Sequence, residues 1–229
     1  MSMRFPFVLA GAFAWVSSVS QGALVISEVL YNEVGSNTAG EFIELFNNGA
    51  FSIDLTGYRI GDEETSGDSS ATESMYAFPS GSTIAAGQTI VIGIGSGTFF
   101  ANYGFRPDYE IIDDSASVPN LVLDSTWDPD GGVINLSNSN DQLLLLDDAG
   151  QVVDMVSWGN TFAMNPALDA SAESDGQSYH RIDPFVDTDT AADWALTTGA
   201  SLSTPGVVPE PGVTVLGIAG LGLLVRRRR

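Results

Sequence analysis

Short apolar runs separated by turn-forming residues are the feature that most constrains the fold of this chain. No segment of twelve or more residues has the 3.6-residue apolar periodicity of an amphipathic helix. Runs rich in Val, Ile, Leu and Phe instead alternate with Gly, Asn, Asp, Ser and Pro, a pattern typical of strands joined by turns. The predicted strands are residues 24–31, 41–46, 53–60, 89–94, 133–136, 143–146 and 152–158. This spacing predicts an all-β protein, an antiparallel β-sandwich.

The expected sandwich is one domain over residues 23–206. Residues 147–150 (DDAG) separate two of the predicted strands and are typical of a tight hairpin in which Gly150 adopts positive φ. Residues 99–103 are expected to form a short helical turn. The chain shows no internal repeat of about 20–50 residues.

The amino terminus is typical of a helical secretory signal peptide over residues 1–22. Arg4 supplies the positive start, residues 5–16 form the apolar stretch, and small polar residues lead to a cleavage position after Gly22 or Ala23. The twelve apolar residues are fewer than the ~20 that span a bilayer as a helix, so a signal peptide is favoured over a transmembrane anchor. Export of the chain is therefore expected.

A second apolar segment, residues 212–225, lies near the carboxyl terminus and is followed by Arg226, Arg227, Arg228 and Arg229. Its fourteen residues make a helix of about 21 Å, shorter than the ~30 Å hydrocarbon core, which can insert where the bilayer thins. The four arginines are expected to stop the helix on the cytoplasmic side and to leave the body outside the cytoplasm. The sequence thus predicts a short C-terminal transmembrane helix in a single-pass membrane precursor.

A Pro-Glu-Pro motif directly precedes this helix. Its residues are Pro209, Glu210 and Pro211, and the two prolines keep the glutamate on an extended, accessible peptide. The motif, the apolar helix and the terminal arginines, in this order over residues 207–229, resemble the PEP-CTERM sorting signal of Gram-negative bacteria. The resemblance implies recognition by an exosortase, a membrane transpeptidase-like enzyme that cleaves near the motif and delivers the body to the cell surface or extracellular matrix. A tail anchor that is never processed is the alternative.

The charge of the chain limits its partners. Without the two ends, 28 acidic residues face Arg59, Arg106 and Arg181, so the body has a net charge of −25 against −21 for the whole chain. Nucleic-acid binding is not expected, because phosphate neutralisation needs clustered Lys or Arg. Cysteine is absent, which excludes disulfides, zinc–thiolate sites and cysteine nucleophiles.

Short motifs follow one another in order along the body. The first are ISEVLYN at 26–32, EFIELFN at 41–47 and DLTGYRI at 54–60. Further pieces are FP at 78–79, IAAGQ at 84–88, LSN at 136–138, DDAGQVVD at 147–154, SYHR at 178–181 and TPG at 204–206. In this order the motifs resemble the lamin tail domain, which implies an immunoglobulin-like β-sandwich. The chain departs from the pattern at Asn140, where a late hairpin usually has glycine, and over residues 62–76, which are an enlarged loop.

The residues offer few candidates for catalysis. His180 is the single histidine and no G-x-S-x-G motif accompanies it, so a Ser-His-Asp triad is not expected. Glu41 and Glu44 lie three apart on a predicted strand and therefore point to opposite faces, which prevents them from acting as a glycosidase pair. The acids of the family motifs are expected instead to accept backbone N–H bonds at strand ends. They are Glu28, Asp54 and Asp154.

Calcium is the ligand that suits the acidic loops best. Asp124, Asp128 and Asp130 cluster before two glycines, and a hard cation favours several oxygen donors on a flexible loop. A second acidic group consists of Asp187, Asp189 and Asp193. Neither group has the glycine and glutamate positions of an EF-hand, and solvated acidic loops without a specific ion are the alternative. No motif requires a cofactor.

These observations predict a non-enzymatic cell-surface or extracellular-matrix protein that acts by protein or polysaccharide interaction. The expected partners are the secretion machinery, an exosortase, and envelope polysaccharide or matrix proteins, with membrane contact through the C-terminal helix. Loops 62–76 and 114–132, at one end of the sandwich, are expected to make the contact. The alternative is a secreted metal-dependent hydrolase whose dispersed acidic residues converge only in the folded chain.

Overall fold

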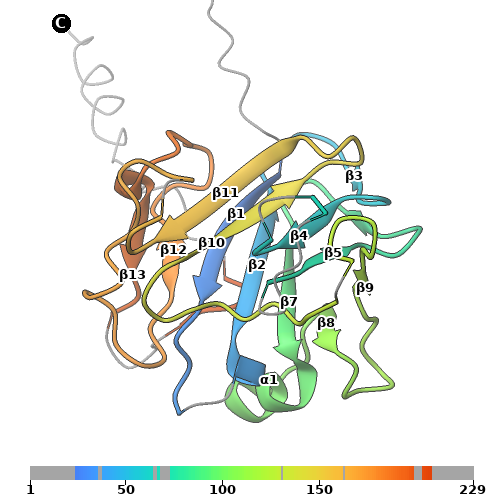
Figure 1. Cartoon of the computed structure of the whole chain (residues 1–229), viewed down its shortest axis with the longest axis horizontal. Coiled ribbons are helices and arrows are strands. Elements are labelled where there is room, and N and C mark those ends of the chain that lie inside the picture. Colours follow the sequence, from blue (N-terminus) through green and yellow to red (C-terminus); the bar gives the residue numbers. More distant parts are fainter. Residues whose placement is uncertain are drawn as a thin grey trace, which may run out of the picture.

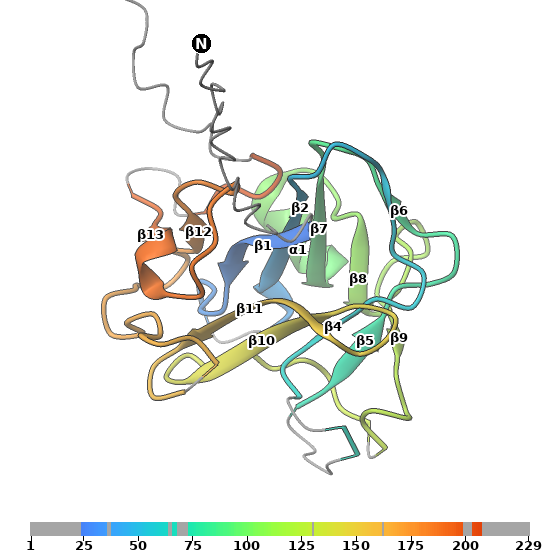
Figure 2. The same cartoon turned by 90° about the horizontal axis from the view of Figure 1, so that it is seen from above.

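Two β-sheets packed face to face form the described part of the chain (Figure 1 and Figure 2). The computed structural model describes residues 24–35, 38–63, 66–67, 73–129, 131–161, 163–198 and 203–207. The larger sheet contains, in spatial order, β13 (Trp194–Leu196), β12 (Tyr179–Arg181), β1 (Leu24–Leu30), β2 (Phe42–Asn47), β7 (Thr89–Gly95) and β8 (Tyr109–Ile112). The smaller sheet contains β11 (Val152–Trp158), β10 (Asp141–Leu146), β4 (Arg59–Gly61), β5 (Met75–Ala77) and β9 (Val122–Leu123). A separate pair is formed by β3 (Ile53–Asp54) and β6 (Thr83–Ile84).

One α-helix, α1 (Ser96–Tyr103), is present among the described residues, together with two 3-10 turns, η1 (Thr38–Gly40) and η2 (Ala191–Asp193). The helix connects β7 to β8, and these two strands run parallel. A crossover of this kind permits parallel pairing, which a tight hairpin does not. The prediction of a wholly antiparallel sandwich therefore needs this one correction, whereas the all-β sandwich itself is confirmed.

The core lies between the sheets and is built from alternate strand positions. On β2, Ile43 and Leu45 face the core and are fully buried. On β1, a bulge between Ile26 and Glu28 changes the phase of the strand, so that Ile26 faces the core before the bulge and Val29 faces it afterwards. The bulge therefore sends Glu28 to the outer face of the larger sheet.

The outer face of the larger sheet carries a second apolar cluster. Leu30, Phe42 and Val91 gather there, and Phe99 of α1 packs edge-on against Phe42 with ring centroids 5.9 Å apart. Figure 2 shows the helix on the side of the larger sheet that faces away from the smaller one. β2 is consequently buried on both faces over its whole length.

Most predicted elements are confirmed. β1, β2, β7, β10 and β11 begin and end within two residues of the predicted strands. The hairpin at residues 147–150 is also confirmed, because the Asp147 N–H donates to the Gln151 carbonyl at 2.9 Å and Gly150 has a φ of 76°. Residues 99–103 are helical as expected, within a helix that begins earlier, at Ser96.

The prediction of one strand over residues 53–60 is wrong. A turn separates β3 from β4, because the Tyr58 N–H donates to the Leu55 carbonyl at 2.9 Å. Gly57 lies in this turn with a φ of 84°, a conformation that glycine adopts without steric cost. Apolar residues alternate with polar ones on both sides of the turn, although the phase changes at Gly57, and the segment therefore resembles a single strand.

The prediction of a strand over residues 133–136 is also wrong. Ile134 and Leu136 are buried in the core, as their apolar character implies. The backbone between them joins no strand, however, and the Asn135 N–H donates instead to Asp62 Oδ2 at 3.0 Å. Burial alone therefore produced the apolar signal, without a ladder of backbone hydrogen bonds.

The predicted signal peptide (residues 1–22) and, apart from residue 207, the predicted sorting signal (residues 207–229) lie outside the described residues. Within the described ranges, no helix has both the length and the apolarity needed to cross a bilayer.

A buried ion pair joins the two sheets. Arg181 Nη2 of β12 lies 2.7 and 2.8 Å from the two carboxylate oxygens of Asp154 on β11, and both side chains are at most 1% exposed. Asp154 Oδ2 also accepts the N–H of Ile26 at 2.6 Å, and Arg181 Nε donates to the Ile26 carbonyl at 2.8 Å. Buried charges are stable only when paired and hydrogen-bonded in this way. The pair thus connects β1, β11 and β12.

Replacing Asp154 by Asn is expected to lower the free energy of unfolding by ~3 kcal/mol, because Arg181 would lose its fully buried counter-charge and keep only the more exposed Asp187 and Asp193. The matched control is D187N, since Asp187 contacts the same guanidinium at 3.1 Å but its side chain is 23% exposed. We expect the control to lose less than about 1 kcal/mol. Urea denaturation followed by tryptophan fluorescence measures both, and equal losses would contradict the structural role assigned to Asp154.

Candidate functional site

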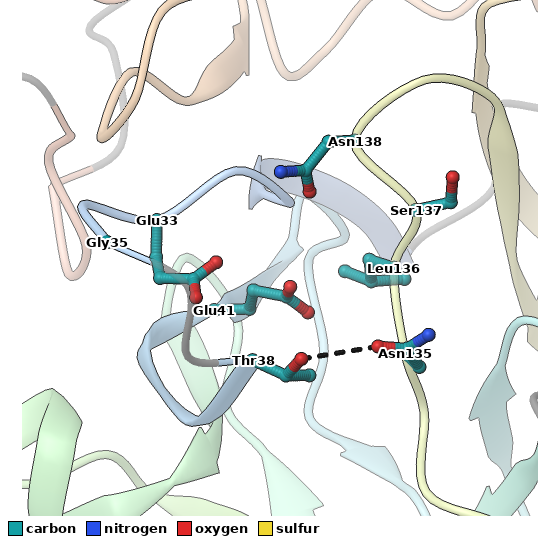
Figure 3. A pocket seen from close by; sticks show the side chains of 8 residues that line it. All are labelled: Glu33, Gly35, Thr38, Glu41, Asn135, Leu136, Ser137 and Asn138. Carbon is teal, nitrogen blue, oxygen red and sulfur yellow. Dashed lines mark hydrogen bonds between the residues drawn. The ribbon is translucent and has the colours of Figure 1, made fainter.

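A polar hollow lies between the β1–β2 connection and the segment that leads into β10. It has a volume of about 350 Å³ and is lined by Glu33, Gly35, Thr38, Glu41, Asn135, Leu136, Ser137 and Asn138. Figure 3 shows the side chains of Glu33 and Glu41 extending from one wall, with residues 135–138 forming the opposite wall. Two segments almost 100 residues apart in the chain therefore enclose it.

Glu41 is the most unusual side chain of this hollow. It follows η1 directly, immediately before β2, and is only 2% exposed. The pKa of Glu41 is raised to about 10, chiefly by burial and also by the nearby carboxylates of Glu33, Asp62 and Asp141, while a hydrogen bond from the Leu136 backbone opposes these effects. Its Oε2 atom is buried and has no hydrogen-bond partner. Glu41 is thus protonated at neutral pH unless a cation compensates its charge.

Glu33 reaches the same hollow from the β1–β2 connection and is 5% exposed. Its position depends on Gly40, because a Cβ at that residue would lie 2.9 Å from Glu33 Cγ. Any side chain at residue 40 would therefore displace Glu33. The glycine lets two buried acids approach each other.

The opposite wall is held in place by hydrogen bonds. The Asn135 N–H donates to Asp62 Oδ2 at 3.0 Å, the Ser137 N–H donates to Asp141 Oδ2 at 2.7 Å, and Trp158 Nε1 donates to the Ser137 carbonyl at 2.6 Å. These bonds replace the strand that the sequence predicted here. The backbone of residues 135–138 is thus held in place by these bonds, although it forms no strand.

Oxygen atoms and negative charge dominate the hollow. Thr38 Oγ1 donates to Asn135 Oδ1 at 3.2 Å across it, and Asn138 Nδ2 donates to Asn32 Oδ1 at 2.8 Å. None of the eight residues that line the hollow is basic. The carboxylates of Asp62 and Asp141 lie behind the wall and add to the negative potential. Such an arrangement attracts a cation.

Of the calcium ligands predicted from sequence, Asp124 and Asp128 do not line this hollow. Asp124 Oδ2 lies 2.5 Å from Arg59 Nε, and its Oδ1 accepts the Thr126 N–H at 3.0 Å. Asp128 is buried, and its two oxygens accept the N–H groups of Gly131 and Gly132 at 3.0 and 3.2 Å. Asp130 lies outside the described residues. Calcium at this loop stays a prediction. Asp124 and Asp128 already accept hydrogen bonds from protein donors.

The second acidic group surrounds an arginine. Carboxylate oxygens of Asp154, Asp187 and Asp189 lie within 4.8 Å of one another. Arg181 Nη1 lies 3.1 Å from Asp187 and 3.9 Å from Asp193, in addition to the pair with Asp154. The guanidinium therefore supplies the positive charge that these acids need.

The end of the described chain lies on a pair of buried glutamates. The Thr204 N–H donates to Glu28 Oε1 at 2.8 Å, and the Gly206 N–H donates to Glu44 Oε2 at 2.5 Å. Burial raises the pKa of Glu28 and raises that of Glu44 to about 7. Residues 203–207 are therefore fastened to the outer face of the larger sheet, immediately before the predicted sorting signal. That signal (Pro209, Glu210, Pro211 and Arg226, Arg227, Arg228, Arg229) lies outside the described residues.

The structural role predicted for the motif acids is confirmed. Glu28, Asp54 and Asp154 accept the backbone N–H groups of Thr204, Thr56 and Ile26, respectively. Glu41 and Glu44 lie in different surroundings, as their spacing predicts. His180 of β12 is half-buried, burial lowers its pKa, and its Nδ1 has no hydrogen-bond partner.

The pairing of Glu33 with Glu41 was missed by the sequence analysis. An acidic residue directly before a strand that is buried on both faces was the available signal, but it did not identify a partner for Glu41. Tertiary packing brings Glu33 beside Glu41, and no local motif records this contact.

Comparison with known proteins agrees with this fold. A family model described as Lamin Tail Domain matches residues 17–160. The crystal structure of a DUF4876 family protein from Bacteroides thetaiotaomicron is similar, with a TM-score of 0.56 and 13% identity, over 82% of this chain and 74% of that one. Likeness at this identity shows the fold alone. No curated protein matches the chain. β12 lies beyond the matched residues but pairs with β1 in the same sheet.

The raised pKa of Glu41 predicts how stability depends on pH when divalent ions are removed. The folded state binds this proton more tightly than the unfolded state, whose glutamate titrates near 4.5, so stability falls as pH rises from about 4.5 towards 10. In E41Q, the free energy of unfolding is expected to fall less steeply with pH than in the wild type, by up to ~1.4 kcal/mol per pH unit. Urea denaturation at several pH values in EDTA measures this slope for both proteins. Glu44 and Asp62 titrate in both proteins, so parallel curves would contradict the assignment to Glu41.

Proposed function

The chain belongs to the lamin tail domain family, and from this premise we propose that it is an exported, non-enzymatic protein of the cell surface or extracellular matrix. It acts by binding a protein or a polysaccharide. Its route is that of a Gram-negative precursor, held in the membrane by the C-terminal helix and sorted by an exosortase. Nucleic acid is not a partner, because the body has 28 acidic residues against three arginines.

The observation that carries the proposal is that several buried carboxylates accept hydrogen bonds from backbone N–H groups. Asp62 accepts the N–H groups of Ser74 and Asn135, and Asp128 accepts those of Gly131 and Gly132. Asp154, Glu28 and Glu44 likewise accept backbone N–H groups. Carboxylates that accept backbone N–H groups in this way join segments of the fold, which is a structural role. They suit a rigid scaffold that presents its loops to a partner.

Two of the expected contact loops also support each other. The Gly67 N–H donates to the Trp127 carbonyl at 2.6 Å, and Trp127 Nε1 donates to the Glu63 carbonyl at 3.1 Å. Loops 62–76 and 114–132 are therefore joined by hydrogen bonds at Glu63, Gly67 and Trp127. A binding surface made from two mutually supported loops loses less conformational entropy on contact than two independent loops.

The position of the C-terminal segment supports the sorting step. The bond between Gly206 and Glu44 fastens the chain three residues before Pro209. A cut at the Pro-Glu-Pro motif would therefore leave every described contact of residues 203–207 in place. The folded body would survive its own release from the membrane.

Intact-mass analysis of the protein from host cells with and without the exosortase tests the proposal. We expect the wild-type mass to lack the residues beyond the Pro-Glu-Pro motif, and the exosortase-deficient cells to keep the full C-terminus in the membrane fraction. E210A is expected to behave like the exosortase deletion, whereas D148N, which changes an exposed acid, should be processed normally. A protein found in the cytoplasm with both termini intact would contradict the proposal.

The alternative, a secreted hydrolase, has one observation in its favour. Two buried carboxylates, Glu33 and Glu41, line one concave hollow, and burial raises the pKa of Glu41 to about 10. Two carboxyl groups that face one concave site are a feature of glycoside hydrolases.

Turnover assays on glycans and phosphoesters, with calcium, magnesium or manganese present, separate the two functions. A binding protein is expected to give no turnover above the buffer rate with wild type, E33Q, E41Q or D148N. Turnover that E33Q and E41Q abolish and D148N retains would establish the hydrolase instead.

A further inference from the structure

We propose that the hollow between the β1–β2 connection and residues 135–138 binds a calcium ion, with Glu33 and Glu41 as its carboxylate ligands. This site is separate from the acidic loop at Asp124 and Asp128. It also holds whether or not the chain is sorted as proposed, because it concerns the folded body alone.

The unsatisfied oxygen of Glu41 is the first argument. Glu41 is 2% exposed and lines the hollow, yet its Oε2 has no hydrogen-bond partner. Asp62 and Asp128 are buried to a similar degree, but each of their oxygens accepts a backbone N–H. A buried acceptor without a donor is costly, and the cost is removed if a ligand occupies the space in front of it.

The chemistry of the lining is the second argument. The walls supply two carboxylates, the Thr38 hydroxyl, and the side-chain amides of Asn135 and Asn138, and they contain no basic group that would neutralise the acids. Calcium takes six to eight oxygen ligands in flexible geometry and accepts water for the remainder. Magnesium is less suitable, because it demands near-octahedral ligands at short distance.

The origin of the ligands predicts what the ion does. Glu33 and Glu41 lie in the connection between β1 and β2 of the larger sheet, whereas residues 135–138 lead into β10 of the smaller sheet. An ion held by both groups joins the two sheets at the edge of the core. Bound calcium should therefore raise the unfolding temperature, because it binds the folded state and not the unfolded one.

The experiment uses the full-length chain, purified in mild detergent and stripped with EDTA. Equilibrium dialysis with radioactive calcium measures uptake, and unfolding temperature is recorded at each calcium concentration. We expect one ion per chain with Kd on the order of 10⁻⁴–10⁻³ M, the range of extracellular modules. E41Q should weaken binding at least tenfold and abolish the calcium-dependent rise in unfolding temperature.

Two control variants make the outcome decisive. D148N removes the same charge from an exposed hairpin residue and should bind like wild type, which excludes diffuse attraction to the acidic body. D128N tests the loop that sequence alone favoured. E41Q is isosteric and uncharged, so in EDTA it should unfold at or above the wild-type temperature, which separates lost binding from lost folding. Uptake lost in D128N but kept in E41Q, or no uptake up to about 10 mM calcium, would overturn the proposal.

Discussion

The bulge in β1 and the ion pair beside it determine how the two sheets are placed. Between Ile26 and Glu28 the strand changes phase, so apolar residues face the core on both sides of the bulge while Glu28 turns to the outer face. At the bulge, the N–H and carbonyl of Ile26 bond to Asp154 and Arg181. These two side chains come from different sheets and pair within 2.8 Å of each other. One short stretch of β1 thereby determines which of its side chains face the core, which face outward, and where the two sheets are joined.

The other buried acids extend the same principle. The body carries far more negative than positive charge, and a folded chain can bury acids only where donors or cations meet them. Most of the described cases use backbone N–H groups, so the carboxylates connect segments distant in sequence. Glu28 and Glu44 do this for residues 203–207, and Asp62 does it for the segment before β10. The fold therefore uses its acidic residues as internal hydrogen-bond acceptors.

Glu41 and Glu44 lie close together in the sequence but in different surroundings. Glu44 of β2 points to the outer face and accepts a hydrogen bond from residues 203–207, whereas Glu41, immediately before β2, reaches the polar hollow. Burial is the main cause that raises the pKa of Glu44 to about 7 and that of Glu41 to about 10. Glu44 meets a hydroxyl donor and a backbone donor that offset its burial, whereas Glu41, among the described residues, meets the Leu136 backbone alone and its Oε2 has no partner. The two acids of one motif thus have separate roles. Glu44 holds residues 203–207 against the larger sheet, and Glu41 lines the hollow.

The sequence determined the class of the fold, because short apolar runs and turn residues define strands and hairpins locally. β10, the DDAG hairpin and β11 were predictable for this reason, as were the N–H acceptors Glu28, Asp54 and Asp154. Only the tertiary structure decided that residues 133–136 are core without being strand, that β8 runs parallel to β7, and that Glu33 meets Glu41. Local patterns record whether a residue is buried and how the backbone turns. They do not record which distant donor or acid faces it, because that depends on how separate segments pack together.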